Sequence, residues 1–280
     1  MSSSAILDRL GLTEDSPLAN LVERNLAPCF VAKSKASTEL SLDNPAPISK
    51  LGGLPDLATE TPKDKTGKPL LFLGQINFAE LCAEKIQVDR CAISIPRGLL
   101  SIFWNERKDM SNPKDRHSFR ILWTDSSQLH HLQAADSNAA SLMHSALTLS
   151  FESSSTLPQN PKDWIDSNSV EQTQIVNLIE RDSAFREHFI CQIFGNADAE
   201  IAKKKEIAAF ASNGISWSPA RSADSCYSHL VDASRDWVFL LRLNSKTELG
   251  FDLASTKSIT LLIHSDDLIA ERLDKAWMVY

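Results

Sequence analysis

Two nearly continuous apolar runs, each with one polar residue, stand out in a chain whose apolar and polar positions otherwise alternate over short distances: residues 70–76 and 237–243. Each run has the length of a strand and no polar face, which is typical of a strand buried on both sides of a sheet. Asn77 follows the first run and Asn244 follows the second. The same pattern therefore occurs twice.

Glycines precede each run, and a further apolar segment follows it. Gly52 and Gly53 come before the first run, and Gly195 comes before the second. Paired glycines favour a tight turn with positive φ. Residues 98–104 and 257–264 come next, and each is predicted to form another strand. The order of turn, strand and strand predicts an internal duplication.

The boundary between the two halves is predicted in a stretch rich in serine and proline, residues 152–162. The halves then span residues 1–155 and 156–280. A chain of 280 residues fits one or two domains. We expect the two halves to form one compact globule with two lobes.

The rest of the pattern predicts short elements without a regular βαβ rhythm. Further strands are predicted at residues 29–32, 119–123, 146–151 and 277–280. Helices are predicted after Ser16-Pro17, at 78–85 with Asn77 and Glu80 as a capping box, from Ser169, at 199–212 ending before Gly214, and at 266–273 capped by Ser265. Residues 215–229 are expected to be irregular. These elements indicate an α+β fold, internally duplicated, with mostly antiparallel sheets and short flanking helices.

The composition favours a soluble globular protein and argues against nucleic-acid and membrane partners. An apolar content of 42% and a charged content of 23% are ordinary for a soluble globular protein. The net charge of −7 argues against nucleic acid as a partner. Neither a signal peptide nor an apolar run of membrane-spanning length is present, so we expect a cytoplasmic protein without a membrane partner. The five cysteines are odd in number and lack CxxC spacing, which favours buried reduced thiols.

Three blocks in the first half resemble the YwqG-like family of uncharacterised, mostly bacterial proteins: residues 49–55, 69–81 and 98–104. They match the family's GG.P turn, its strand–helix unit and its following strand, and weaker blocks follow in the second half. The chain has Thr61-Pro62 where the family has Trp-Pro, and its second turn at residues 194–198 lacks the family's proline and glutamine. The resemblance implies a duplicated α+β fold and no established activity. Some relatives resemble members of toxin–immunity neighbourhoods, which implies a protein-binding role.

The duplicated strands supply the candidate site residues. Gln75 and Asn77 in the first half, and Arg242 and Asn244 in the second, could converge with Gly52 and Gly53 on a ligand between the lobes. The competing interpretation is structural: asparagine before a helix caps it, and polar groups in apolar strands must be hydrogen-bonded. We favour the structural interpretation for both pairs.

No catalytic or metal-binding motif is present, and no catalytic residue can be named. His130, His131 and His144 lack further ligands at recognised spacing, so we expect no metal and no cofactor. The leading hypothesis is a non-enzymatic protein-binding module, with an immunity or inhibitor protein as one form of it, contacting its partner through residues 105–117 or 212–229. The alternative is an enzyme or small-ligand binder with its site between the lobes, near the glycine turns.

Overall fold

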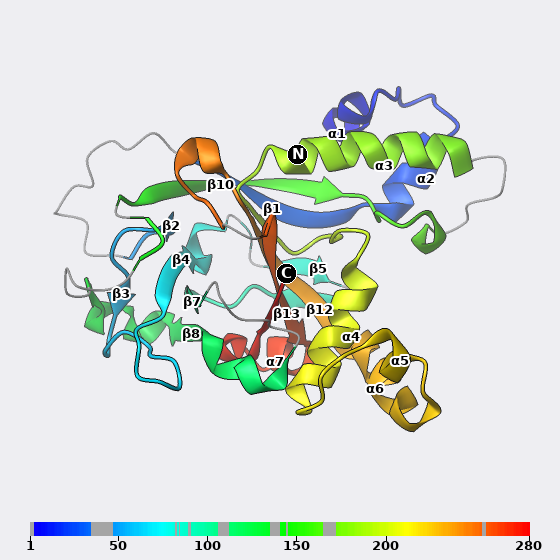
Figure 1. Cartoon of the computed structure of the whole chain (residues 1–280). Coiled ribbons are helices and arrows are strands. Elements are labelled where there is room, and N and C mark those ends of the chain that lie inside the picture. Colours follow the sequence, from blue (N-terminus) through cyan, green and yellow to red (C-terminus); the bar gives the residue numbers. More distant parts are fainter. Residues whose placement is uncertain are drawn as a thin grey trace.

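The fold is a mixed α+β structure built around one antiparallel sheet of ten strands (Figure 1). A computed structural model describes residues 3–34, 47–81, 83, 85–88, 91–105, 112–134, 141–143, 145–164, 172–253 and 256–280. The predicted helix start at Ser169, residues 106–111 of the predicted contact segment 105–117, Cys82 and His144 lie outside these residues.

The sheet has the strand order β14-β13-β12-β11-β1-β10-β2-β4-β7-β8. Its first five strands along the chain are β1 (Ala27–Ser34), β2 (Lys50–Leu51), β4 (Leu71–Asn77), β7 (Gly98–Trp104) and β8 (Phe119–Asp125). The other five are β10 (Leu147–Thr156), β11 (Cys191–Ile193), β12 (Trp237–Asn244), β13 (Ser258–His264) and β14 (Trp277–Val279). Two small ribbons pair β3 (Asp56–Leu57) with β9 (Gln133–Ala134) and β5 (Lys85–Val88) with β6 (Cys91–Ser94).

The strand order reads the same from both ends when β2, β4, β7 and β8 are matched with β11, β12, β13 and β14. The central strands β1 and β10 connect the two halves of the sheet. Strand β1, from the start of the chain, pairs with β11 of the second half, and β10, which spans the predicted boundary, pairs with β2 of the first. At the outer edges, the Phe119 ring of β8 packs against the Trp277 ring of β14 at 5.3 Å. The sheet therefore nearly closes on itself.

The irregularities of the two halves match as well. The pairing of β4 with β7 shifts register between Phe72 and Gly74, and that of β12 with β13 shifts between Phe239 and Leu241. These are the same positions in the two apolar runs. Extra residues of this kind bend a strand locally. The extra residue is Leu73 in β4 and Leu240 in β12.

The two glycine turns also occupy equivalent places. Gly52 and Gly53 have φ of 64° and 66°, and Phe194 and Gly195 have φ of 58° and 79°. A Cβ atom on Gly53 would lie 2.8 Å from Cβ of Ala146, and one on Gly195 would lie 2.7 Å from Cβ of Cys29. Gly53 thus packs against the residue just before β10, and Gly195 packs against β1. A side chain at either glycine would collide with these neighbours.

Helices cover the sheet on separate faces. Helices α1 (Ser3–Leu10), α2 (Ala19–Asn25) and α3 (Gln172–Glu187) lie together beside β1 and β10 and share a hydrophobic cluster (Figure 1). Helix α4 (Ile201–Ser212) packs against β12 and β14. Helices α5 (Pro219–Ser222), α6 (Ser228–Ala233) and α7 (Ser265–Ile269) are short. Leucine, isoleucine and phenylalanine from both halves fill the largest core, with α4 contributing.

Most predicted strands are confirmed, and three local predictions are wrong. The predicted linker at residues 152–162 begins inside β10, because the serines of that stretch pair with β1. The proposed boundary after residue 155 therefore falls within a strand. The predicted helix at residues 78–85 is a single 3₁₀ turn, Phe78–Glu80, since β5 already begins at Lys85. Residues 215–229 are mostly helical rather than irregular.

The two predicted caps also differ in detail. Asn77 accepts a hydrogen bond from the Ala79 amide, but Glu80 accepts one from the Ser49 amide instead of completing a capping box. The last helix is capped by the His264 side chain and not by Ser265, which lies within α7. The predicted end of α4 is confirmed, because Gly214 follows the cap residue with φ of 78°.

Candidate functional site

The predicted site residues form two groups, one in each half. Gln75 and Asn77 lie on β4, and Arg242 and Asn244 lie on β12, with four strands between β4 and β12 in the sheet. The hydrogen bonds described for Gln75 go to Ile48 and Asp56, and those of Asn244 go to Phe189 and Arg242. Among the described contacts, none joins the two groups.

The two asparagines hold equivalent carbonyl groups. Nδ2 of Asn77 donates to the Pro47 carbonyl at 2.8 Å, and Nδ2 of Asn244 donates to the Phe189 carbonyl at 2.8 Å. In each half this bond ties the end of the long strand to the segment that leads into the glycine turn. Both asparagines therefore have a structural role at the ends of their strands.

Each glycine turn is followed by an aspartate that forms an ion pair with a cation on an adjacent strand. In the first half, Asp56 binds Nζ of Lys50 on β2 at 3.0 Å and the amide of Gln75 on β4. In the second half, Asp198 lies 3.7 Å from Nη1 of Arg242 on β12. Gln192 occupies the position of Lys50. The cation therefore lies on β2 in the first half and on β12 in the second, and the Gln192 amide donates to the carbonyls of Phe194 and Asn196 instead of to Asp198.

The second half carries one further cation at this place. Nζ of Lys204, on α4, lies 2.7 Å from Oδ2 of Asp198 and donates to Oγ1 of Thr260 at 3.1 Å. The Lys204 side chain is 7% exposed and that of Arg242 is 14% exposed. Two largely buried cations therefore share one carboxylate, which is itself 25% exposed.

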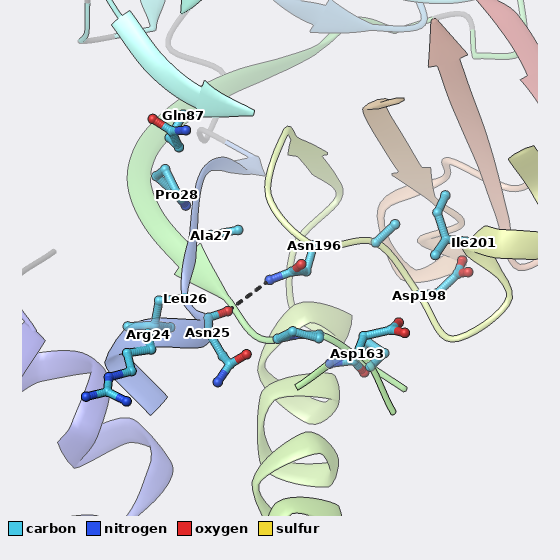
Figure 2. A pocket seen from close by; sticks show the side chains of 13 residues that line it. Arg24, Asn25, Leu26, Ala27, Pro28, Gln87, Asp163, Asn196, Asp198 and Ile201 are labelled. Atoms are coloured by element: carbon cyan, nitrogen blue, oxygen red, sulfur yellow. Dashed lines mark hydrogen bonds between the residues drawn. The ribbon is translucent and has the colours of Figure 1, made fainter. Parts of the chain in front are cut away.

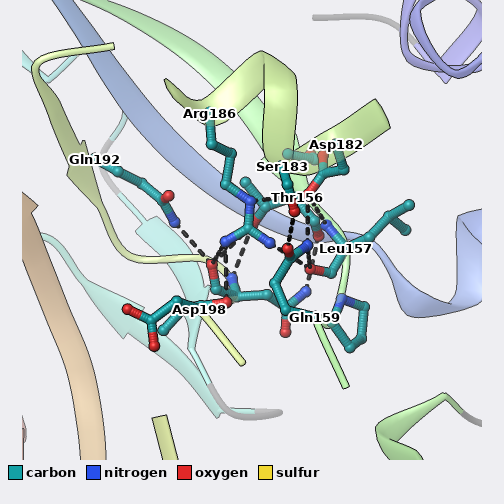
Figure 3. A network of polar contacts seen from close by, with 12 residues as sticks. Thr156, Leu157, Gln159, Asp182, Ser183, Arg186, Gln192 and Asp198 are labelled. Carbon is teal, nitrogen blue, oxygen red and sulfur yellow. Dashed lines mark hydrogen bonds and ion pairs between the residues drawn. The ribbon is translucent and has the colours of Figure 1, made fainter. Parts of the chain in front are cut away.

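Arg186 on α3 binds this turn from the opposite side (Figure 3). Its Nε donates to Oδ2 of Asp182 at 2.9 Å, and its Nη2 donates to the Leu157 carbonyl at 2.7 Å. Nη1 donates to the carbonyls of Asn196 and Ala197 at 2.6 and 3.0 Å. One guanidinium thus connects α3, the segment after β10 and the second glycine turn.

Asp182 is fully buried and holds a second arginine. Its Oδ1 accepts from Nη2 of Arg9 at 3.0 Å, and its Oδ2 accepts from the Leu157 amide at 3.1 Å. Desolvation lowers the pKa of Arg9, and the Asp182 charge raises it in part. The Arg9 guanidinium also lies 3.9 Å from the centre of the Phe185 ring. This cluster joins α1 to α3 and to the end of β10.

A pocket of about 480 Å³ opens beside this network, at the junction of the two halves (Figure 2). The first half contributes residues 24–28 and Gln87, and the second contributes residues 158, 159, 163, 196–198 and 201. Four side-chain amides, two carboxylates and one guanidinium face it: Asn25, Gln87, Gln159, Asn196, Asp163, Asp198 and Arg24. We call this cavity the junction pocket.

The wall of the junction pocket is held by hydrogen bonds. Nδ2 of Asn196 donates to the Thr156 carbonyl at 2.8 Å and to the Asn25 carbonyl at 3.4 Å. Nε2 of Gln159 donates to Oδ2 of Asp182 at 3.2 Å. The pocket wall is therefore preformed, while Gln87 and Asp163 at its mouth are exposed.

The nearby cysteine has no features of a nucleophile. Burial raises the pKa of the Cys29 thiol to about 12, although Arg186 and Arg9 lower it in part. Burial also raises the pKa of Cys191. Cys226 is exposed, contrary to the expectation of buried thiols, and a hydrogen bond to Asp224 raises its pKa. A raised pKa disfavours the reactive thiolate.

Two further searches cover only the residues that the structure describes. Within that part of the chain, no three histidine, cysteine, aspartate or glutamate side chains gather as a potential metal site. None of the described helices is both long enough and apolar enough to cross a membrane.

The sequence did not indicate Arg9, Asp182, Arg186 or Asn196 as site residues. The only local signal was the four-residue spacing of Asp182 and Arg186, which is typical of an ion pair on one helix face. Arg9 and Asn196 come from distant segments, so only the fold brings them to this helix.

Comparison with protein families gives a match over most of the chain. Residues 49–280 match a family described as Domain of unknown function (DUF1963). The match begins just before β2 and includes both glycine turns, both long strands and α3. No curated protein matches the chain. The chain therefore belongs to the DUF1963 family of domains of unknown function.

Proposed function

We propose that the protein is a non-enzymatic binding protein whose partner enters the junction pocket. The observation that carries this proposal is that both halves of the chain build this pocket and that its wall is fixed by the Arg186 network. Preformed concave sites at the junction of structural units are the preferred places for ligands. A duplication origin of the halves, YwqG-like membership and a cytoplasmic location are part of the same proposal.

The lining of the junction pocket supports a polar, mostly uncharged ligand group. Side-chain amides both donate and accept hydrogen bonds, so they suit main-chain amides and hydroxyl groups. The lining holds one guanidinium, that of Arg24, and two carboxylates, those of Asp163 and Asp198, and this near-balance of charge disfavours a strongly charged ligand. A segment of a protein partner supplies such uncharged groups, and it is our first candidate.

A small polar molecule is the second candidate, because a volume of about 480 Å³ lies within the range of small-molecule sites. The two candidates differ in the size of the binding species. We therefore propose to divide an extract of the source cells into macromolecular and low-molecular-weight fractions. Each fraction is added to the full-length protein, and the unfolding temperature is measured, since binding to the native state raises it.

A pair of matched variants locates the effect. Gln87→Trp fills the mouth of the pocket from the exposed side of β5, whereas Gln133→Trp places the same side chain on the exposed strand β9. We expect the stabilising fraction to act on the wild-type protein and on Gln133→Trp, but not on Gln87→Trp. If neither fraction stabilises the wild-type protein, or if Gln87→Trp responds fully, the proposal is wrong.

A further inference from the structure

A second cavity, of about 530 Å³, lies where β12 ends and β13 begins, next to the end of α3. All eight lining residues are polar. Three of them are cations, Arg242, Lys246 and Lys257, and one, Glu187, is an exposed carboxylate. We call this cavity the basic pocket. Its lining carries a net charge of +2, three cations less one acid, within a chain whose net charge is −7.

Comparison of the two halves shows which cation of the second half has no charged counterpart in the first. Arg242 pairs with Gln192 across β11, and Gln75 pairs with Lys50 across β2. Gln75 is therefore the counterpart of Arg242. The first half balances Asp56 with Lys50 alone, and its glutamine needs no counter-charge. The second half has an arginine at that place in addition to Lys204.

Arg242 has weak internal compensation for its charge. Asp198 lies 2.7 Å from Lys204 but 3.7 Å from Arg242, so it mainly neutralises Lys204. Nε of Arg242 donates to Oδ1 of Asn244 at 2.8 Å, which is a neutral acceptor. Desolvation lowers the pKa of Arg242, Asp198 raises it, the nearby Arg186 lowers it further, and Glu187 raises it in part. An external anion would complete this balance.

The other two cations are placed to meet such an anion. Lys246 is held at the cavity by a hydrogen bond to the Glu187 carbonyl, its side chain is 17% exposed, and its Nζ is 3.8 Å from Oε1 of Glu248. Lys257 is exposed at the entrance. Three hydroxyl groups complete the lining, those of Ser245, Thr247 and Ser258. Arginine, lysine and hydroxyl groups together are the usual donors to phosphate.

We propose that the basic pocket binds the phosphate group of a small molecule through Arg242, Lys246 and Lys257. A phosphate group has enough acceptor oxygens to meet all three cations together, whereas a carboxylate has only two. The exposed Glu187 at the rim disfavours a ligand with further negative charge on that side. This site is separate from the junction pocket and does not depend on the function proposed for it.

The test titrates inorganic phosphate into the full-length protein by isothermal calorimetry at constant ionic strength, with chloride as the balancing anion and acetate as the carboxylate arm. We expect saturable phosphate binding and none with acetate. Lys257→Gln should weaken phosphate binding about threefold, as for an exposed charge. Arg242→Gln should weaken it at least tenfold, as for a mostly buried charged donor.

Two controls keep the result decisive. Lys65→Gln removes an exposed lysine of the first half and should leave phosphate affinity unchanged. Arg242→Gln copies the residue found at Gln75, so it should fold with nearly unchanged stability, whereas a purely structural arginine would not tolerate the change. If Arg242→Gln does not fold, Lys257→Gln against Lys65→Gln decides. Equal binding of acetate, no binding of phosphate, or equal affinity in the two lysine variants would overturn the proposal.

Discussion

Replacement of Arg186 by lysine tests whether the guanidinium holds the junction together by its geometry or only by its charge. Arg186 is 3% exposed and binds one carboxylate and three carbonyls in different directions. A lysine ammonium keeps the charge but is a single point that cannot reach all four acceptors. Each hydrogen bond to a charged group contributes about 1.5–3 kcal/mol, so the loss of one or two gives about 3 kcal/mol.

Arg186→Ala also removes the charge and should cost about 3–5 kcal/mol, as for a broken buried ion pair. Against a total stability of about 5–15 kcal/mol, either loss is large. The assay is urea unfolding followed by tryptophan fluorescence and circular dichroism. Arg235→Lys is the matched control, because Arg235 is 82% exposed in an ion pair with Asp232, and it should change stability by less than about 0.5 kcal/mol. A loss below about 1 kcal/mol in Arg186→Lys would refute the reasoning.

Two further predictions concern the glycine turn and a half-buried acid. Gly195→Ala should lower the unfolding temperature clearly more than Gly67→Ala. Both residues have positive φ, but only Gly195 has close neighbours, with Cβ of Cys29 at 2.7 Å from an added Cβ; equal losses would contradict the packing argument. Burial raises the pKa of Glu80 despite its bond from Ser49, so its ionisation destabilises the fold as pH rises through the folded-state pKa. Glu80→Gln should therefore be the more stable protein at pH 7 and equal to wild type at pH 4 in thermal unfolding, and a more stable wild type at pH 7 would contradict this sign.

The long strands could be predicted from the sequence because their burial requires apolar residues at nearly every position. Strands β4 and β12 are buried on both faces, and a strand in that position needs a continuous apolar run. The two glycine turns could be predicted for a similar reason, since positive φ at residues 52, 53 and 195 favours glycine. Phe194 shows the limit of this rule, because its positive φ is imposed by the surrounding fold.

The central strand β10 was only partly predictable. Its second part, residues 152–156, has the composition of a linker, yet it pairs with β1 from Glu152↔Val31 to Thr156↔Ala27. Backbone hydrogen bonds to a neighbouring strand do not require particular side chains, so tertiary context overrides the local preference of serine. The pairing of β1 with β11 and of β10 with β2 joins segments that are distant in the chain, so no local sequence pattern predicts it.

The candidate sites were harder to predict than the fold because they arise from differences between two similar halves. The repeated frame has one aspartate after each glycine turn and one polar position on each long strand. The first half fills that position with Gln75 and keeps its charges balanced; the second fills it with Arg242 and adds Lys204. A structural role alone would be served by either choice. The phosphate site that we propose depends on this extra cation in the second half, and the comparison of Arg242→Gln with the natural Gln75 tests that proposal within one molecule.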